Sequence, residues 1–229
     1  MHIFEHLAEV RRRLLFTLAV FTAAALFSYL FVDRIRASLA APAGELVYLG
    51  VTEAFLLNVR LALYSGCFLT LPFAIYHFWS FILPALRRRE RFYVTLATFL
   101  SLLCFFLGAA FAFFVILPFT VRFFLGFASE SLQPMLTFSS YLAFSSGIIF
   151  GFGLLFELPV VVLILARLGI ISAAFLRAHR KYAIVIIFIV AAFLTPPDVF
   201  SQLLMGIPLA VLYEVSILLA ALVSRRSGT

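Results

Sequence analysis

Long apolar runs separated by short polar segments dominate the pattern of this chain. A run of about 20 apolar residues, at about 1.5 Å per residue, crosses the roughly 30 Å hydrocarbon core of a bilayer as a helix. The pattern therefore predicts an all-α polytopic membrane protein with six transmembrane helices. The predicted spans are residues 14–32, 61–83, 92–117, 141–165, 182–194 and 203–223.

The last two predicted helices are expected to be too short to fill an ordinary bilayer. Residues 182–194 form about 20 Å of helix, and the run 203–223 is interrupted by Pro208 and Glu214. Residues 195–198 form a turn between them, because Pro197 disfavours helical backbone at the residue before it. Local thinning of the bilayer or tilting of neighbouring helices is the expected response.

The second predicted span carries two further signals. It contains Pro72, at which we expect a bend. Its end is rich in aromatic rings, which is typical of the belt that transmembrane helices place at the water interface. The residues of this predicted belt are Tyr76, His77, Trp79 and Phe81.

Composition supports a membrane protein and excludes a water-soluble one. The chain is 65% hydrophobic and 12% charged, with a mean hydropathy of +1.18, whereas soluble domains are about 45–50% apolar and about 25% charged. The segments outside the apolar runs are too short for a soluble module. We therefore expect one membrane domain spanning residues 1–229, with only residues 224–229 disordered.

The distribution of cations predicts the orientation. With six spans, thirteen of the 17 Lys and Arg residues fall on one side and four on the other. Cytoplasmic segments carry the excess of Lys and Arg, so both termini are expected in the cytoplasm. The four cations on the opposite side are Arg34, Arg36, Arg60 and Arg122.

Nothing in the sequence indicates catalysis or a cofactor. Cys67 and Cys104 lie inside apolar runs, where thiols behave as small hydrophobes, so a disulfide is not expected. The four histidines have no Cys or carboxylate at metal-ligand spacing, and no metal site is predicted. No glycine-rich phosphate loop or nucleophile elbow occurs, so we expect no enzyme and no cofactor.

Glu9 and Glu90 are candidate receptors for a cation. Each also has a purely structural interpretation: Glu9 lies four residues before Arg13 on a helix face, which is worth about 0.3–0.5 kcal/mol, and Glu90 suits the first turn of a helix. Apart from Glu5, they are the only acids expected on the basic side. They are therefore the natural targets for an incoming arginine.

Glu157 lies inside a predicted span, about ten residues from Arg167. A charge near the bilayer midplane costs about 2.5–3.5 kcal/mol on insertion scales, so such a residue usually faces a cavity or a partner. The structural alternative is a hydrogen bond to another helix, with Gln202 as one possible partner. Glu214 and Asp198 are also candidates for partner contact, although the sequence favours a helix N-cap for Asp198.

Several uncommon segments occur in a fixed order along the chain. They are residues 6–11 (His-Leu-Ala-Glu-Val-Arg) with 13–14, residues 76–86 with 90–91, residues 150–151 with 156–159 (Phe-Glu-Leu-Pro), residues 195–198 (Thr-Pro-Pro-Asp) with 201–202, and residues 208 and 213–214. Over almost its whole length the chain resembles the TatC family of the twin-arginine protein translocase.

The resemblance implies a concave bundle of six helices in the bacterial cytoplasmic membrane. It implies a core receptor that binds the twin-arginine signal peptides of folded cargo. The receptor would work in an oligomeric complex with small single-span partners of the TatA and TatB types, and the proton-motive force would drive transport. Membrane lipids are further expected partners, and nucleic acid is not. By position, the residues implied for signal-peptide binding are Glu9 and Glu90, with Arg11 and Phe81 beside them, and those implied for partner contact or transport are Glu157 and Gln202. Asp198 and Glu214 are further candidates for partner contact.

The chain departs from the family pattern at a few positions, and other functions stay open as alternatives. Val10 stands where Leu is usual and His77 where Gln is common, and the extra arginines before Glu90 put the strength of its contact in doubt.

A proton-coupled secondary transporter for a small solute is the main alternative, because a midplane acid and broken helices suit one. Such folds usually contain internal repeats, and none is visible here. An intramembrane enzyme and a purely structural scaffold are further alternatives.

Overall fold

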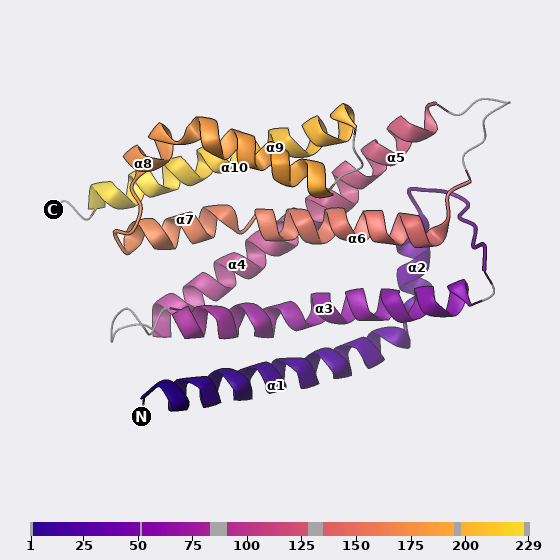
Figure 1. Ribbon diagram of the computed structural model, residues 1–229, viewed down its shortest axis with the longest axis horizontal. Helices are drawn as coiled ribbons and strands as arrows, with labels where there is room; N and C mark the ends of the chain where they lie inside the picture. Colours follow the sequence, from indigo (N-terminus) through magenta and orange to yellow (C-terminus); the bar gives the residue numbers. More distant parts are fainter. Residues whose placement is uncertain (1, 51, 83–90, 128–134, 195–197, 227–229) are drawn as a thin grey trace. The chain divides into compact units, whose positions relative to one another are not determined.

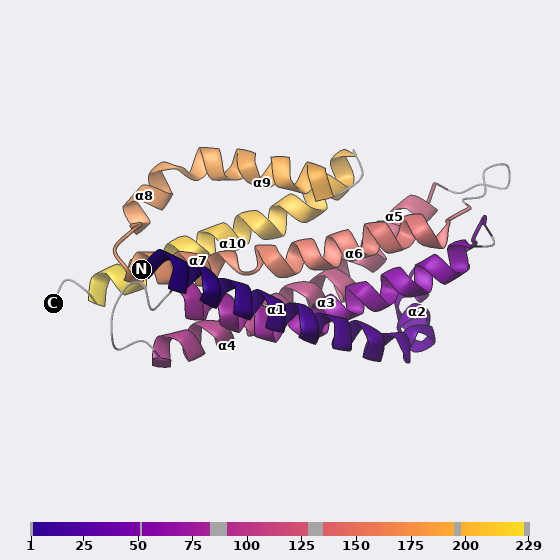
Figure 2. The ribbon, with the colours of Figure 1, turned by 60° about the horizontal axis from the view of Figure 1, so that its bottom comes forward.

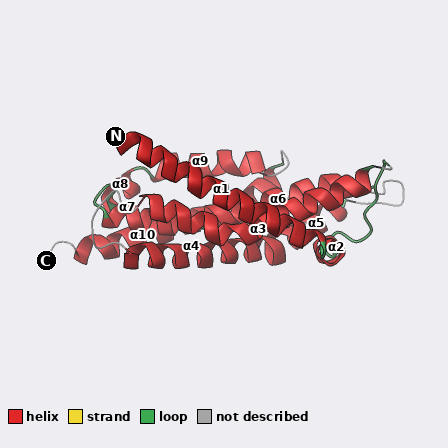
Figure 3. Cartoon of the chain, turned by 90° about the horizontal axis from the view of Figure 1, so that it is seen from below, coloured by secondary structure: helices red, strands yellow, loops and turns green. Residues whose placement is uncertain are grey.

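The computed structural model describes residues 2–50, 52–82, 91–127, 135–194 and 198–226, and within these it describes the side chains of all but residues 2–10, 81–82, 91–94 and 224–226. The described residues form helices and loops (Figure 3), with a single isolated bridge between Val47 and Thr137. The elements are α1 His2–Tyr29, α2 Val32–Ala40, α3 Glu53–Ile82, α4 Arg91–Phe111, the π-helix η1 Ala112–Ile116, α5 Leu117–Leu125, α6 Phe138–Leu155, α7 Leu158–Arg167, α8 Ala173–Ala178, α9 Arg180–Leu194 and α10 Val199–Arg226.

Five described stretches of helix are long and apolar enough to cross a membrane. The remaining predicted span, residues 182–194, corresponds to α9, whose 15 residues extend about 22 Å at about 1.5 Å per residue. We expected both of the last two helices to be short. This is confirmed for α9 and is wrong for α10, which is 28 residues long. The first span ends earlier than predicted, at Tyr29, and α3 begins earlier, at Glu53.

The helices group into two compact units. The first comprises Met1–Leu102 and Met135–Leu142, and the second comprises Leu103–Pro134 and Ala143–Thr229. The single domain and the concave bundle expected from the sequence stay predictions.

In the first unit, α1 and α3 lie side by side and antiparallel (Figures 1 and 2). The ring of Phe16 lies 6.4 Å from the ring of Phe73 and 5.9 Å from that of His77. Further along the pair, Gly66 of α3 lies directly against the backbone of Ala25 in α1. Small residues permit such close approach between membrane helices, whose association depends on packing because lipid is as apolar as Leu.

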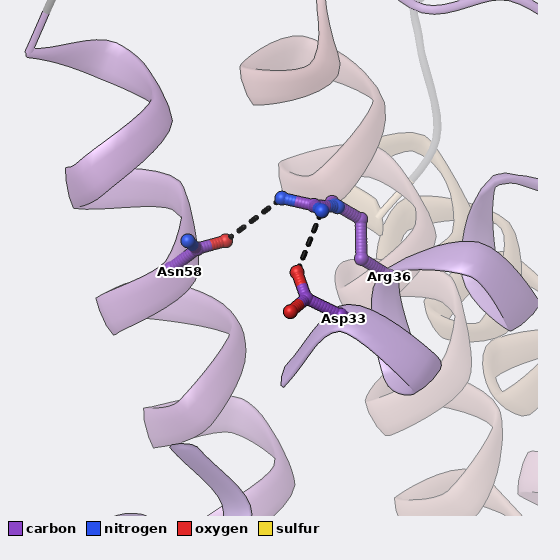
Figure 4. A network of polar contacts seen from close by, with 3 residues as sticks. All are labelled: Asp33, Arg36 and Asn58. Atoms are coloured by element: carbon purple, nitrogen blue, oxygen red, sulfur yellow. Dashed lines mark hydrogen bonds and ion pairs between the residues drawn. The ribbon is translucent and has the colours of Figure 1, made fainter. Parts of the chain in front are cut away.

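The opposite end of this unit, where α1 ends and α3 begins, is tied together by hydrogen bonds. The phenol of Tyr141 donates to the carbonyl oxygen of Leu39 at 2.8 Å. Figure 4 shows Arg36 of α2 donating to Asn58 of α3 at 3.3 Å and pairing with Asp33 at 2.6 Å. Because the Asp33–Arg36 pair lies within α2 and is largely exposed, it adds little stability. The bond that joins α2 to α3 is the one from Arg36 to Asn58.

The second span does not end in the simple aromatic belt that we predicted. Trp79 is only 4% exposed, and its indole Nε1 donates to the hydroxyl of Ser101 in α4 at 2.9 Å. A buried indole N–H needs an acceptor, and a serine one helix away supplies it. Tyr76 is exposed as expected. Trp79, in contrast, packs between α3 and α4 and does not face the interface.

The core of the second unit joins α6, α9 and α10 to the π-helix. Ala112 and Ile116 of the π-helix are buried against Ile148 and Phe152 of α6. The N–H of Leu117 donates to the carbonyl of Ala112, five residues earlier. This wider turn directly precedes Pro118, whose ring nitrogen cannot donate to the turn before it. The third predicted span therefore continues past Pro118 to residue 125 instead of ending at residue 117.

The fourth predicted span is broken at Glu157. Helix α6 ends at Leu155 and α7 begins at Leu158. Pro159 has no N–H with which to continue the helical hydrogen bonds across this point. The carbonyl of Glu157 instead accepts from the N–H groups of Val160 and Val161, both at 3.0 Å.

Candidate functional site

Three helix ends lie at the same end of the first unit: the beginnings of α1 and α4 and the end of α3. Since α1 and α3 are antiparallel, the beginning of α1, which carries Glu9, lies at the same end as Ile82, the last residue of α3. The bond between Trp79 and Ser101 holds α3 beside α4, and α4 begins at Arg91 at this end. The fold therefore brings the beginnings of α1 and α4 and the end of α3, which are far apart in sequence, to the same end of the unit.

The four predicted signal-peptide residues are described to different extents. Arg11 is exposed on α1. Glu9 and Phe81 lie on α1 and α3, but their side chains fall outside the described part of the structure. Glu90 lies outside the described residues, directly before Arg91 in the sequence. The structure therefore places the helices of this group and leaves the contacts of its carboxylates as predictions.

Glu157 occupies the break between α6 and α7, inside a 30-residue candidate span. Its side chain is half-buried. The neighbouring helix α4 approaches α6 very closely here, because an added Cβ on Gly108 would lie 2.6 Å from the carbonyl oxygen of Phe152. The carboxyl group therefore lies in a tightly packed, locally unwound part of the second unit.

Asp198 and Gln202 stabilise the start of α10. One carboxylate oxygen of Asp198 accepts from the backbone N–H of Ser201 at 2.7 Å, which confirms the N-cap expected from the sequence. The side-chain amide of Gln202 donates to the carbonyl oxygen of Phe188 in α9 at 3.0 Å. Both side chains thus have structural roles where α10 meets α9.

Glu214 forms an ion pair that the sequence did not reveal. Its carboxylate lies 2.7 Å from the guanidinium of Arg180, at the start of α9, and the two side chains are 50% and 48% exposed. A pair this exposed contributes at most about 1 kcal/mol. The partners are 34 residues apart, so no local spacing indicates the pair. An incoming cationic partner at Glu214 would have to displace Arg180.

The acidic side chains described above are suited to binding a partner. Within the described ranges, no cluster of three or more His, Cys, Asp and Glu side chains is arranged to hold a metal ion. The acids lie singly, at a helix beginning, a helix break, an N-cap and an exposed pair. Such groups can bind cations, hydrogen-bond partners or protons.

Comparison with known proteins decides the family. A family model described as Sec-independent protein translocase protein (TatC) matches residues 5–208. The chain belongs to the TatC family. It is 39% identical to the TatC protein of Desulforapulum autotrophicum over 98% of this chain and 86% of that protein. It is 40% identical to the TatC protein of Carboxydothermus hydrogenoformans over 96% of this chain and 93% of the relative.

The fold agrees with the family. A crystal structure of the twin-arginine translocase receptor TatC superposes with a TM-score of 0.85 at 36% identity, covering 96% of this chain and 99% of that one. The resemblance inferred from the sequence segments is therefore confirmed. This TatC-family protein is a multi-pass component of the translocase in the cytoplasmic membrane, and the alternative of a secondary transporter is not supported.

Proposed function

We propose that this TatC-family protein is the receptor that binds twin-arginine signal peptides and passes folded cargo to single-span TatA- and TatB-type partners. The observation that carries the proposal is the family match over residues 5–208, together with the convergence of α1, α3 and α4 at the end that carries Glu9. The protein acts by binding and conformational change and performs no covalent chemistry.

Recognition of two arginines follows from the charges at this end. A guanidinium forms bidentate, charge-assisted pairs with a carboxylate, and each such bond contributes about 1.5–3 kcal/mol. Glu9 and Glu90 supply two carboxylates on segments that the antiparallel helices bring to one end. Arg11 and Arg12 are exposed on α1, two and three residues after Glu9 in the sequence, and their positive charge disfavours basic peptides that cannot pair with both acids.

Partner contact and energy coupling are assigned to the second unit. Glu157 lies in a broken span, where an ionisable side chain is costly unless it serves a contact or a proton step. Asp198, Gln202 and Glu214 lie along α10 and complete the proposed contact surface for the single-span partners. The energy source is the proton-motive force, which supplies about 2.3 kcal/mol per charge per 100 mV.

The first test is site-specific photocrosslinking of a twin-arginine signal peptide to the full chain in native membranes that contain its partners. Wild type is compared with Glu9→Gln and Glu90→Gln, which remove one negative charge each and keep the side-chain size. We expect each variant to weaken peptide binding about tenfold or more, because one charge-assisted pair is lost. A twin-lysine peptide, which cannot form the bidentate pair, is expected to crosslink weakly to wild type.

A matched control removes an acid from the other end of the same unit. Glu45 is exposed in the segment between α2 and α3, and Glu45→Gln is expected to leave the crosslinks unchanged. Equal crosslinking by wild type, Glu9→Gln and Glu90→Gln would exclude the two acids as the receptor. A loss that is also seen in Glu45→Gln would show a general charge effect and would equally contradict the assignment.

Glu157 is tested separately by its effect on transport. We expect Glu157→Gln to bind signal peptide normally and to export cargo poorly, because the change leaves the first unit intact. Export and partner copurification at wild-type levels would remove Glu157 from the mechanism.

A further inference from the structure

The segment from the end of α7 to the first turn of α9 exposes both cations and apolar side chains. Ile170, Phe175 and Tyr182 are 61%, 52% and 56% exposed. Arg177 and Lys181 are exposed in the same stretch of sequence, in which the ring of His179 lies 4.1 Å from that of Phe175 and 6.0 Å from that of Tyr182. Arg177, Lys181 and the three exposed apolar side chains form what we call the α8 surface, at the end of the second unit that the charge distribution predicts to be cytoplasmic.

Helix α8 is held in place, so these side chains project from a fixed support. Ala173 and Leu176 are buried in a cluster with residues of α7 and α10. The phenol of Tyr213 donates to the carbonyl oxygen of Leu176 at 3.0 Å. At the start of α8, the hydroxyl of Ser172 accepts from the N–H of Phe175 at 3.1 Å. A fixed segment loses less conformational entropy when it binds a ligand than a mobile one does.

No acid among the described residues pairs with the cations of the α8 surface. Glu214 is the acid that faces this region from α10, and it is paired with Arg180 at 2.7 Å. In the described part of the chain, neither Arg177 nor Lys181 forms an ion pair. The ammonium of Lys181 lies 5.0 Å from the centre of the Tyr182 ring, a cation–π contact that leaves it charged. The α8 surface thus offers two cations to an anion.

An apolar stripe leads from these cations along α9. Tyr182, Ile186, Ile189 and Phe193 follow one another at helical spacing, and all are strongly exposed, Phe193 to 87%. The stripe begins at the cationic start of α9 and ends at Phe193, one residue before the helix ends. A ligand that matches both features has an anionic head and a long apolar tail.

We propose that the α8 surface and the exposed stripe of α9 bind one anionic phospholipid, with its phosphate at Arg177 and Lys181 and an acyl chain along α9. Basic residues at the cytoplasmic ends of transmembrane helices bind anionic headgroups in this way. An acidic peptide would use the two cations but would leave the apolar stripe without a matching partner. The inference is independent of signal-peptide binding, because it concerns the second unit alone.

The test is native mass spectrometry of the full chain, titrated with phosphatidylglycerol or with phosphatidylcholine of the same acyl chains. Wild type is compared with the double variant Arg177→Gln/Lys181→Gln. We expect wild type to prefer phosphatidylglycerol and the double variant to bind it roughly tenfold to thirtyfold more weakly, because two headgroup contacts are lost. Binding of phosphatidylcholine is expected to change little.

Two control variants separate the site from general charge and from misfolding. Arg34→Gln/Arg122→Gln also removes two exposed cations, from the side predicted to be opposite, and is expected to keep wild-type binding. The exchange Arg177→Lys/Lys181→Arg keeps both charges and is expected to retain the lipid. Equal affinity of wild type for both lipids would overturn the proposal. So would equal losses in the two glutamine double variants, or competition by an acidic peptide that displaces the lipid completely.

Discussion

The close approach of α1 and α3 in the first unit predicts that Gly66→Ala destabilises the protein. A Cβ added to Gly66 would lie 2.6 Å from the Cα and 2.7 Å from the N of Ala25. Both atoms belong to the backbone of α1, so no rotation of a side chain relieves the clash. An ordinary van der Waals contact begins at about 3.4 Å, and α1 must therefore move away from α3 by roughly 0.8 Å at this point.

The cost follows from that separation. Overpacking of a tight contact costs about 1–3 kcal/mol, and a gap of about 0.5–1 Å forfeits about a quarter to a half of the dispersion energy of the atoms beside it. Alanine recovers up to about 1 kcal/mol of helix propensity. We expect a net loss of about 1–2 kcal/mol in the free energy of unfolding. Ala25→Gly is not expected to rescue the variant, because the two shortest contacts are to backbone atoms.

The matched control is Gly147→Ala in α6, where an added Cβ would meet nothing within 4 Å. There the same substitution gains helix propensity without a clash, so it is expected to raise stability by up to about 1 kcal/mol. Thermal unfolding of the detergent-solubilised protein, followed by size-exclusion chromatography after heating, measures both variants. An unfolding temperature for Gly66→Ala equal to or above that of Gly147→Ala would refute the packing argument.

Substitutions at three further positions test single hydrogen bonds by the same unfolding assay. Tyr141→Phe removes the bond to the carbonyl of Leu39. It is expected to lower the free energy of unfolding by at least about 1 kcal/mol, because a buried carbonyl loses its donor. Trp79→Phe leaves its buried serine acceptor without a donor and is expected to cost about 1–3 kcal/mol; a change below about 0.5 kcal/mol would contradict this. Asp198→Ala is expected to cost about 1 kcal/mol, whereas Asp198→Asn keeps an acceptor for the N–H of Ser201 and should cost much less. Equal losses in the two Asp198 variants would show that charge, not capping, matters there.

The sequence was most informative where a property depends on residues close together in the chain. Apolar runs predicted the spans, because crossing a bilayer depends on length and hydropathy alone. The N-cap at Asp198 is local as well, since the carboxylate and the N–H that it accepts are three residues apart. The sequence did not determine the helix limits at Pro118 and Pro159. A missing N–H can produce either a π-turn, as before Pro118, or a break, as before Pro159, and the surrounding packing decides between them.

The tertiary structure alone decided which faces meet. Hydropathy cannot distinguish a lipid-facing residue from a buried one in a membrane helix, because lipid and protein core are equally apolar. For this reason Trp79 was assigned to an interfacial belt although it is buried against α4. For the same reason the pairing of Glu214 with Arg180 and the bond from Gln202 to the carbonyl of Phe188 could not be predicted. Composition and short-range pattern determined that this chain is a bundle of membrane helices, whereas the close contacts at positions such as Gly66 decided how those helices pair.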